Sequence, residues 1–274
     1  MTWSRPDIER LLAEQGLSPR RALGQNFVAD PNTVRRIVRL AGIEAGCRVV
    51  EVGAGLGSLT IALAEAGADV TAVELDAHLV ALLRPMVEPL GVRVVEADAL
   101  RVDWATALDP SLGPWRLVAN LPYNVATPLV MLLLEQAPAL DRLFVMVQAE
   151  VGERFAALPG TAAYGAVSVL IAYWAQARVV GRVPPTVFVP RPKVDSALVA
   201  IDRRPVPAVD PAAVAYERLK VVVRAGFGQR RKMLRRSLAD VVSPEAFAAA
   251  GVRPEERAEQ LDVAAWGRLA AWRP

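Results

Sequence analysis

The stretch RVVEVGAGLGSLTIALAEAGADVTAVE, residues 48–74, decides the fold of this chain. It consists of an apolar run, Arg48–Val52, a turn with three glycines, a helical pattern over Ser58–Ala66 and a second apolar run, Asp69–Glu74. Short apolar runs bounded by glycine predict buried strands, and a helix between two of them is typical of a βαβ unit with parallel strands. We therefore expect a parallel sheet around this stretch.

The same alternation continues towards the C-terminus. Further strands are predicted at Val92–Glu96, Arg116–Ala119, Leu143–Gln148, Val179–Val183 and Ala197–Asp202. Helical patterns lie between several of them, at Asp76–Val87 and at Thr127–Glu135, where Thr-Pro is a helix start signal. This order predicts an α/β fold with a doubly wound, mostly parallel, seven-stranded, Rossmann-like sheet.

The pattern changes at the proline-containing stretch Arg203–Pro207, which predicts a linker. Residues 211–274 show helical periodicity and no convincing strand. We therefore expect two domains. Residues 1–204 would carry the sheet, preceded by an N-terminal extension over residues 1–31, and residues 205–274 would form a small helical domain.

Composition excludes several classes of protein. The chain has 274 residues, 53% of them hydrophobic and 22% charged, which fits a soluble globular protein. No run approaches the ~18 apolar residues of a membrane span. Because the N-terminus also lacks an apolar signal core, we expect a cytoplasmic protein without membrane contact. A single cysteine, Cys47, and a single histidine, His78, argue against a disulfide, a Ser-His-Asp triad and a resident metal. No exposed apolar stripe is evident, which favours a monomer.

Positive charge is concentrated near the C-terminus. The net charge of the chain is only +3, but residues 206–274 contain twelve Lys and Arg against eight Asp and Glu. Six of these cations occur in the basic segment, residues 224–236, without an intervening acid: Arg224, Arg230, Arg231, Lys232, Arg235 and Arg236. A solvated helix face is the ordinary explanation of such a run. The absence of acids favours phosphate contacts, hence RNA binding, by this segment.

The glycine turn predicts a ligand at the carboxyl edge of the sheet. Gly53, Gly55 and Gly57 precede a helix N-terminus, where backbone N–H groups can approach a ligand closely. Glu74 ends the second strand, 21 residues after Gly53, where a carboxylate can bind ribose hydroxyls. These features also suit a dinucleotide, and a purely structural glycine turn is a further alternative.

Two observations point away from a dinucleotide. Ser58 stands where the pattern G-x-G-x-x-G requires glycine, and a second acid, Asp98, follows the third strand. A carboxylate at that position can accept a hydrogen bond from an adenine amine, although Asp98 alone could equally be a helix N-cap. Together with Glu51 and Glu74, Asp98 predicts a site for S-adenosylmethionine at the ends of consecutive strands.

Asn120-Leu121-Pro122-Tyr123 follows the fourth predicted strand. The Asn120 side-chain oxygen and the Leu121 carbonyl can accept hydrogen bonds from the two N–H bonds of an exocyclic adenine amine, while the Tyr123 ring stacks on the base. Such a motif would clamp an adenine, and its amide would also touch the cofactor. The alternative is a plain turn after a strand, since Asn and Pro are common turn residues.

With these motifs in place, the chain resembles the ribosomal RNA adenine dimethyltransferase family, in particular its bacterial small-subunit branch. The resemblance runs from about residue 20 to about residue 265. The motifs that carry it are LGQNFV (23–28), EVGAGLG (51–57), VELD (73–76), EADA (96–99), NLPYNVATP (120–128), VFVPRPKVDSA (187–197) and FGQRRKMLRRSL (227–238). The chain departs from the commoner pattern at Val28, Ala54, Ala119 and Gly228, of which only Gly228 removes a polar side chain.

The resemblance implies a methyltransferase with S-adenosylmethionine as methyl donor and S-adenosylhomocysteine as product. It implies N6-dimethylation of two adjacent adenosines near the 3′ end of 16S rRNA, in the small ribosomal subunit or its precursor. The cofactor contacts that it implies are Gln25, Asn26, Val28, Glu51, Gly53, Gly55, Gly57, Glu74, Leu75, Asp98, Ala99 and Asn120. Phe188 is the candidate for the second face of the target base, with core packing as its alternative.

Two other functions fit the same motifs less well. One is a large-subunit rRNA adenine methyltransferase of the macrolide-resistance type, which Leu121 and the LGQNF segment argue against. The other is a largely non-catalytic, RNA-binding factor in ribosome assembly, which the intact cofactor and adenine motifs argue against.

Overall fold

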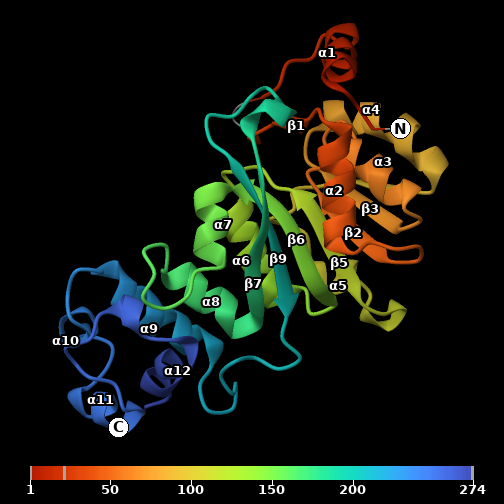
Figure 1. Cartoon of the computed structure of the whole chain (residues 1–274). Helices are drawn as coiled ribbons and strands as arrows, with labels where there is room; N and C mark the ends of the chain where they lie inside the picture. Colours follow the sequence, from red (N-terminus) through yellow and green to blue (C-terminus); the bar gives the residue numbers. More distant parts are fainter. Residues whose placement is uncertain (1, 21–22, 273–274) are drawn as a thin grey trace. The chain divides into compact units, whose positions relative to one another are not determined.

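The computed structural model describes residues 2–20 and 23–272, so parts of the predicted N-terminal extension and the last two residues lie outside the described residues (Figure 1). The chain divides into two compact units. We call Met1–Gly152 with Arg178–Arg203 the sheet unit, and Glu153–Ala177 with Arg204–Pro274 the helical unit. The predicted boundary at residue 204 agrees with this division, but the prediction did not include the segment 153–177 in the helical unit, where it packs with the C-terminal helices.

The main sheet has the seven predicted strands. In chain order they are β2 (Arg48–Val52), β3 (Asp69–Glu74), β4 (Arg93–Glu96), β5 (Trp115–Asn120), β6 (Leu140–Gln148), β7 (Ala175–Val183) and β9 (Ser196–Arg203). Their spatial order is β4-β3-β2-β5-β6-β9-β7. The pairs from β4 to β6 are parallel, whereas β6 and β9 are antiparallel. The expectation of a mostly parallel, doubly wound sheet is confirmed.

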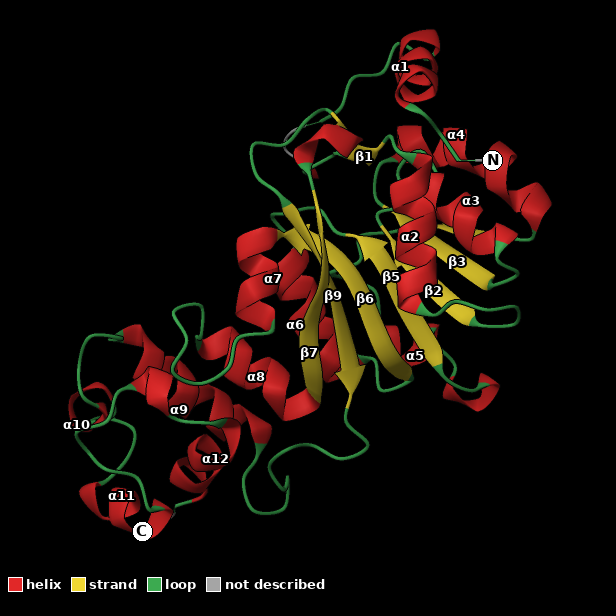
Figure 2. Cartoon of the chain, in the orientation of Figure 1, coloured by secondary structure: helices red, strands yellow, loops and turns green. Residues whose placement is uncertain are grey.

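Helices cover the sheet on both faces, as the buried strands require. Figure 2 shows α2 in front of the sheet and α6 behind it. The helices of the sheet unit are α1 (Arg5–Glu14), α2 (Pro31–Ala41), α3 (Ser58–Glu65), α4 (Ala77–Val87), α5 (Trp104–Ala107) and α6 (Ala126–Gln136), and α7 (Ala149–Phe155) continues into the helical unit. Short 3-10 turns occur at Glu88–Leu90, Pro110–Leu112, Pro185–Val187 and Ala258–Gln260.

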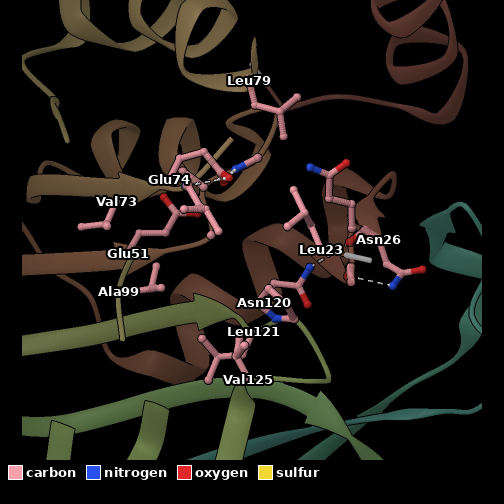
Figure 3. A pocket seen from close by; sticks show the side chains of 18 of the residues that line it. Leu23, Asn26, Glu51, Val73, Glu74, Leu79, Ala99, Asn120, Leu121 and Val125 are labelled. Carbon is pink, nitrogen blue, oxygen red and sulfur yellow. Dashed lines mark hydrogen bonds between the residues drawn. The ribbon is translucent and has the colours of Figure 1, made fainter. Parts of the chain in front are cut away.

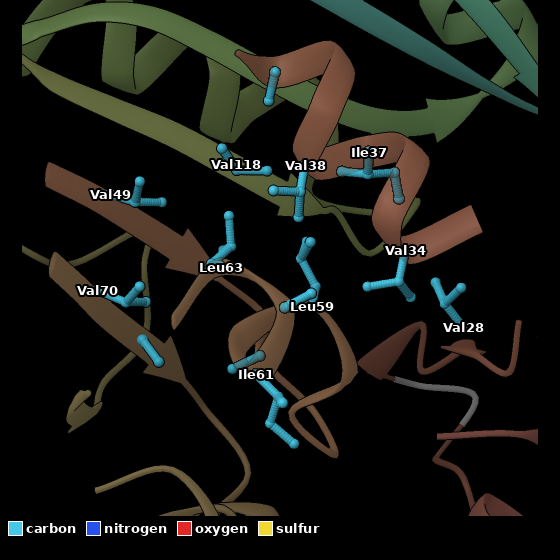
Figure 4. Packing of buried hydrophobic residues seen from close by; sticks show 14 of the residues in the cluster. Val28, Val34, Ile37, Val38, Val49, Leu59, Ile61, Leu63, Val70 and Val118 are labelled. Carbon is cyan, nitrogen blue, oxygen red and sulfur yellow. The ribbon is translucent and has the colours of Figure 1, made fainter. Parts of the chain in front are cut away.

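Strand alternation explains the core under α2 and α3. Val49 and Val118 point to this face, where they meet Val34 and Val38 of α2 and Leu63 of α3 (Figure 4). Their neighbours on the strands, such as Val50 and Leu117, are equally buried but point to the opposite face. Runs that are apolar on both faces hold the central strands rigid, which is what a precise site at their ends needs.

An extra two-stranded sheet and a helix lie outside the predicted pattern. β1 (Phe27–Val28) pairs with β8 (Phe188–Val189) in an antiparallel register, and α1 packs beside them. Arg5 of α1 donates from Nη2 to the carbonyl oxygen of Phe188 at 2.9 Å. The N-terminal extension is therefore attached to a segment 160 residues further along the chain, a pairing that no local pattern announces.

The helical unit has an aromatic core of its own. Its helices are α8 (Ala166–Trp174), α9 (Tyr216–Gly228), α10 (Leu234–Ser237), α11 (Pro244–Ala250) and α12 (Val263–Ala271). The Phe227 ring lies 5.9 Å from Tyr164 and 5.8 Å from Trp266 between ring centroids. A side chain at Gly226 would place its Cβ 2.3 Å from the Trp266 ring, so the close approach of α9 and α12 requires glycine there.

The predicted linker at Arg203 is firmly bound. The Arg203 guanidinium donates to the carbonyl oxygens of Leu133, Leu134 and Ala137 at 3.0–3.2 Å, which caps the C-terminus of α6. Burial lowers the pKa of this arginine. Arg204 in turn donates to the Ala172 carbonyl near the end of α8. These bonds satisfy carbonyl groups that a helix end otherwise leaves without donors.

None of the helices in the described part of the chain has the length and apolar character that a membrane span requires.

Candidate functional site

Strand order places the site at the carboxyl ends of β2 and β5. After β2 the chain builds the sheet outward through β3 and β4, and then returns to the other side of β2 with β5. Open α/β sheets bind ligands at such a reversal, because the loops after the two strands diverge and leave a crevice. The glycine turn and the Asn120–Tyr123 segment are these two loops.

A cavity of about 260 Å³ occupies this crevice (Figure 3). The predicted residues that line it are Gln25, Asn26, Val28, Glu51, Gly53, Gly55, Glu74, Leu75, Asp98, Ala99, Asn120, Leu121, Pro122 and Tyr123. The cavity thus brings together four loops and the N-terminal segment, which are scattered over 100 residues of sequence. Sequence reasoning missed further lining residues, among them Leu23, Phe27, Leu79 and Leu100. Leu23 and Phe27 belong to the LGQNFV motif and could have been found there.

The glycine turn has a backbone that other residues rarely adopt. Gly53 and Gly55 have φ angles of 76° and 58°. A Cβ atom at Gly55 would also lie 3.1 Å from the Phe27 ring, so the turn leaves no room for a side chain. The tight turn directs the Gly55 N–H towards the side chain at the end of β3.

Glu74 is that side chain, and its carboxylate is held by the backbone. Oε2 accepts a hydrogen bond from the Gly55 N–H at 2.8 Å, and Oε1 accepts from the N–H groups of Leu75 and Asp76 at 2.9 Å each. Burial raises the pKa of Glu74, against the effect of these three donors. A carboxylate offers about four acceptor positions, so the fixed group can still accept from a ribose hydroxyl.

Glu51 is the second buried acid of the cavity. Its side chain is 2% exposed, and among the described residues Oε2 has no hydrogen-bond partner. Burial raises the pKa of Glu51 to about 8, and the charge of Glu74 contributes in the same direction. A carboxyl with this raised pKa is largely protonated at neutral pH, and a buried polar atom without a partner is costly, so Oε2 is available to a polar group of a ligand in the cavity.

Asp98 lines the cavity from the loop after β4 and is partly exposed. Oδ1 accepts from the Leu100 N–H at 3.0 Å, and Arg101 approaches Oδ2 at 3.5 Å. Leu75, which is 50% exposed, and Leu100, which is 38% exposed, also line the cavity. Two exposed leucines next to a carboxylate suit a flat, apolar ring with an amine at its edge.

Asn120 ends β5 with its amide in a defined orientation. Nδ2 donates to the Asn26 carbonyl oxygen at 3.0 Å, so Oδ1 is the end left to accept from a ligand (Figure 3). The loop that follows is fixed by a hydrogen bond from the Leu121 N–H to the Met146 carbonyl on β6. Tyr123 is partly buried and bonds through its hydroxyl to Ser196 at 2.9 Å.

The N-terminal segment closes the cavity on one side. Gln25 donates from Nε2 to Asp76 Oδ2 at 3.0 Å and accepts from the Arg20 N–H. Arg20 also forms an ion pair with the Asp76 carboxylate, which is itself the N-cap of α4. Gln25 therefore attaches this segment to the end of β3 at the side of the cavity that it lines.

Two predicted site residues do not line the cavity. Phe188 is the first residue of β8 and is fully buried in the hydrophobic core, so its ring lies outside the cavity where it was expected to form the second face of a base site. Gly57 lies behind the turn as the left-handed N-cap of α3, where an added Cβ would be 2.8 Å from Leu83. Its role is packing between α3 and α4, not contact with a ligand.

The six cations of the basic segment fall into two classes. All of them are exposed. Arg230 and Arg235 form ion pairs with Glu259 and Glu255 at 3.3 and 3.4 Å. Within the described part of the chain the others have no acidic partner, namely Arg224, Arg231, Lys232 and Arg236.

Fold and cavity together define a nucleoside-binding α/β enzyme of the methyltransferase type, and comparison with known proteins names the family. Residues 16–273 match the family described as ribosomal RNA adenine dimethylase. A "Ribosomal RNA small subunit methyltransferase A" of Thermobifida fusca (strain YX) is 49% identical over 98% of this chain and 95% of that protein.

Two solved structures are also similar. The 23S rRNA methyltransferase ErmE is 27% identical, with a TM-score of 0.70 over 89% of this chain and 98% of that one. A dimethyladenosine transferase from Plasmodium falciparum, at 21% identity, has a TM-score of 0.72 over 88% of this chain and 94% of its own, which supports the fold. The chain belongs to the ribosomal RNA adenine dimethylase family, whose members are S-adenosylmethionine-dependent methyltransferases.

Proposed function

We propose that this protein dimethylates N6 of two adjacent adenosines near the 3′ end of 16S rRNA, in the small ribosomal subunit or its precursor. S-adenosylmethionine is the methyl donor, S-adenosylhomocysteine the product, and no metal takes part. The observation that carries the proposal is Asn120, whose side-chain oxygen is left to accept in the cavity that Glu74 also lines.

The residues present fit the cofactor. Glu74 would bind the ribose hydroxyls, and Asp98 the adenine amine between Leu75 and Leu100. Glu51 has a buried oxygen without a donor, which suits a cationic or N–H group of the cofactor. The donor set contains carboxylates, backbone amides and apolar side chains. Among the described residues, no group of three or more His, Cys, Asp or Glu side chains could hold a metal ion.

The chemistry requires positioning more than acid–base catalysis. S-adenosylmethionine, when bound, supplies an activated methyl group whose leaving group departs neutral. The difficulty is the adenine N6, because its lone pair is delocalised into the ring. Asn120 Oδ1 and the Leu121 carbonyl would accept hydrogen bonds from its two N–H bonds, which favours a more tetrahedral nitrogen with an available lone pair.

Tyr123 would hold the target base against this pair of acceptors. Stacking on an aromatic ring contributes roughly 1–3 kcal/mol per base, and extruding the base from its helix or loop costs a few kcal/mol. Phe188, buried as it is, supplies no second face. The first product retains one N–H, so a second transfer needs only one of the two acceptors.

The basic segment would bind the RNA backbone. Arg224, Arg231, Lys232 and Arg236 are exposed and have no acidic partner among the described residues, so they are available to phosphates. Arg230 and Arg235 would contribute less, because Glu259 and Glu255 neutralise them. We further propose that the protein acts as a monomer in the cytoplasm, where its substrate is assembled.

A large-subunit substrate is the second candidate, since ErmE, a 23S rRNA methyltransferase by name, shares the fold. The experiment that separates the two uses purified protein, tritiated S-adenosylmethionine and three substrates: unmethylated small subunits, large subunits and free rRNA. Label confined to the small subunit supports the proposal. Label on large-subunit RNA selects the second candidate, and no label at all indicates a non-catalytic assembly factor.

A further inference from the structure

The aromatic ring of the proposed base site is attached to a second element of the sheet. Tyr123 lies in the loop between β5 and α6, and its hydroxyl is 2.9 Å from Ser196 Oγ. Ser196 is the first residue of β9, is 0% exposed and lies opposite Gln148 of β6. The partner of the tyrosine is therefore a rigid, buried strand and not a neighbouring loop.

We propose that Ser196 is a positioning residue of the methyl-transfer site, whose hydroxyl fixes the plane of the Tyr123 ring on which the target adenine stacks. This inference rests on the proposed function. It assigns a role to the serine of the PKVDSA motif, which lines no part of the cavity and which sequence reasoning left without a function.

Without the bond to Ser196, the Tyr123 ring would be free to change its orientation. The loop Leu121–Val125 forms turns, so its backbone has no ladder of hydrogen bonds to hold Tyr123. The Leu121 N–H bonds to Met146 on β6, and β6 pairs with β9, the strand of Ser196. The loop is thus held at two points: the Leu121 N–H bonds to β6, and the Tyr123 hydroxyl bonds to β9, the strand next to β6.

The hydroxyl pair is stable to changes of pH in the neutral range. Burial raises the pKa of Tyr123, so its hydroxyl stays protonated, and a serine hydroxyl does not titrate. Each hydroxyl can donate or accept, so one of them donates to the other in this bond. Because a misplacement of about 1 Å can cost on the order of 100-fold in rate, holding the ring at two points would affect turnover as well as binding of the base.

A purely structural role for Ser196 makes a different prediction. Loss of its hydroxyl would then lower stability, since Tyr123 would keep an unsatisfied hydroxyl, but Tyr123→Phe together with Ser196→Ala would restore an apolar pair and with it full turnover. A positioning role predicts instead that the double variant is as slow as either single variant.

The test is a double-mutant cycle on turnover. Ser196→Ala, Tyr123→Phe and the double variant are assayed with unmethylated small ribosomal subunits and S-adenosylmethionine. We expect kcat to fall about five- to tenfold in each single variant and by the same factor, not its square, in the double variant. KM for the subunits and the calorimetric Kd for S-adenosylmethionine should change less than about twofold.

Matched controls delete the same two groups elsewhere. Ser168→Ala removes a buried hydroxyl that donates to the Arg154 carbonyl at 2.6 Å, and Tyr164→Phe removes one that donates to the Leu261 carbonyl at 2.8 Å. Both lie in the helical unit and should lower the Tm without changing kcat. If Ser196→Ala fails to fold, Tyr123→Phe alone must still show the loss of kcat, because it breaks the same bond.

Wild-type turnover in Tyr123→Phe, or losses that multiply in the double variant, would overturn the role of Ser196 and leave the proposed function standing. A wild-type protein that labels no ribosomal RNA would overturn the proposed function, and the inference with it.

Discussion

The cavity of the sheet unit and the basic segment of the helical unit are built on opposite principles. In the cavity, Glu74 and Asn120 are oriented by hydrogen bonds to the backbone, at distances of 2.8–3.0 Å. In the basic segment, exposed side chains extend from α9, from the turn that follows it and from α10, and four of the six have no acidic partner among the described residues. The polar groups of the cavity are preorganised for a ligand, whereas ligand binding by the basic segment would depend on the number of its charges.

The two regions should therefore respond differently to amino-acid substitutions. A preorganised group loses its function when a single atom is replaced, because its geometry cannot adjust. A group of mobile cations loses affinity in proportion to the number of charges removed, and salt masks the loss. The cavity should therefore respond to conservative changes, and the basic segment only to the count and pairing of its charges.

Asn120→Ala should have the largest effect. Removing the side-chain acceptor should lower the methyl-transfer rate at least about 1,000-fold, with the fold and the Tm nearly unchanged. The measurement is single-turnover transfer to unmethylated small subunits. Asn32→Ala, which deletes an exposed amide at the start of α2, is the control and should behave like wild type. Full activity of Asn120→Ala would refute the adenine clamp.

Within the basic segment, two double variants with equal charge loss can be compared. Arg231→Gln with Lys232→Gln should weaken binding to small subunits roughly 30-fold at 0.15 M salt, because each lost phosphate contact costs about fivefold there. Arg230→Gln with Arg235→Gln removes the same charge from ion pairs and should weaken it much less. Filter binding over a salt series measures both, and equal losses would mean that only net charge matters.

Glu74→Gln should weaken the cofactor more modestly. The amide keeps the shape of the carboxylate but loses its charge and one acceptor, so the Kd for S-adenosylmethionine should rise roughly tenfold. Isothermal titration calorimetry is the measurement. Glu96→Gln at the end of β4, which is exposed and pairs with Glu74 in the strand register, is the matched control. A Kd equal to that of wild type would remove Glu74 from the cofactor site.

Glu51→Gln should change the pH dependence of the free energy of unfolding, measured in the absence of cofactor. With a pKa of about 8 in the folded protein and an ordinary value near 4.5 in the unfolded chain, the folded state binds the extra proton between these limits. Stability should therefore fall as pH rises from about 5 to 8, by about 1.4 kcal/mol per pH unit. Urea unfolding over this range should show the slope in wild type and a smaller slope in Glu51→Gln, where the raised pKa of Glu74 still contributes; parallel curves would contradict the burial argument.

Sequence periodicity was sufficient for the main sheet but not for what surrounds it. All seven strands were predicted, because runs such as Arg48–Val52 are apolar on both faces and end at glycine. The pairing of Phe27 with Val189 and the docking of α1 depend on contacts between distant residues, which local patterns do not encode. The membership of 153–177 in the helical unit has the same cause.

For the candidate site, as for the fold, the sequence predicted the residues at the strand ends but not the contacts between distant residues. The acids and glycines that line the cavity sit at strand ends, where topology alone brings them together. The sequence left Phe188 with two interpretations, a face of the base site or core packing, because an aromatic residue in a motif looks the same whether it faces a ligand or the core. Burial decided for the core, since both residues of β8 are enclosed. The sequence did not predict a role for Ser196, because the proposed role depends on one hydrogen bond to Tyr123, which is 73 residues away.

The bond from Asn120 to the Asn26 carbonyl also bears on how the protein would tolerate shortening. Asn26 follows the segment that Gln25 attaches to β3, and its carbonyl fixes which end of the Asn120 amide faces the cavity. A truncation that removed residues up to Asn26 would keep the seven strands of the main sheet but would delete α1 and uncover Phe27 and Val189, which α1 packs against. It would also free the Asn120 amide to rotate, so the shortened protein would combine lower stability with the kinetic defects of an active-site mutant.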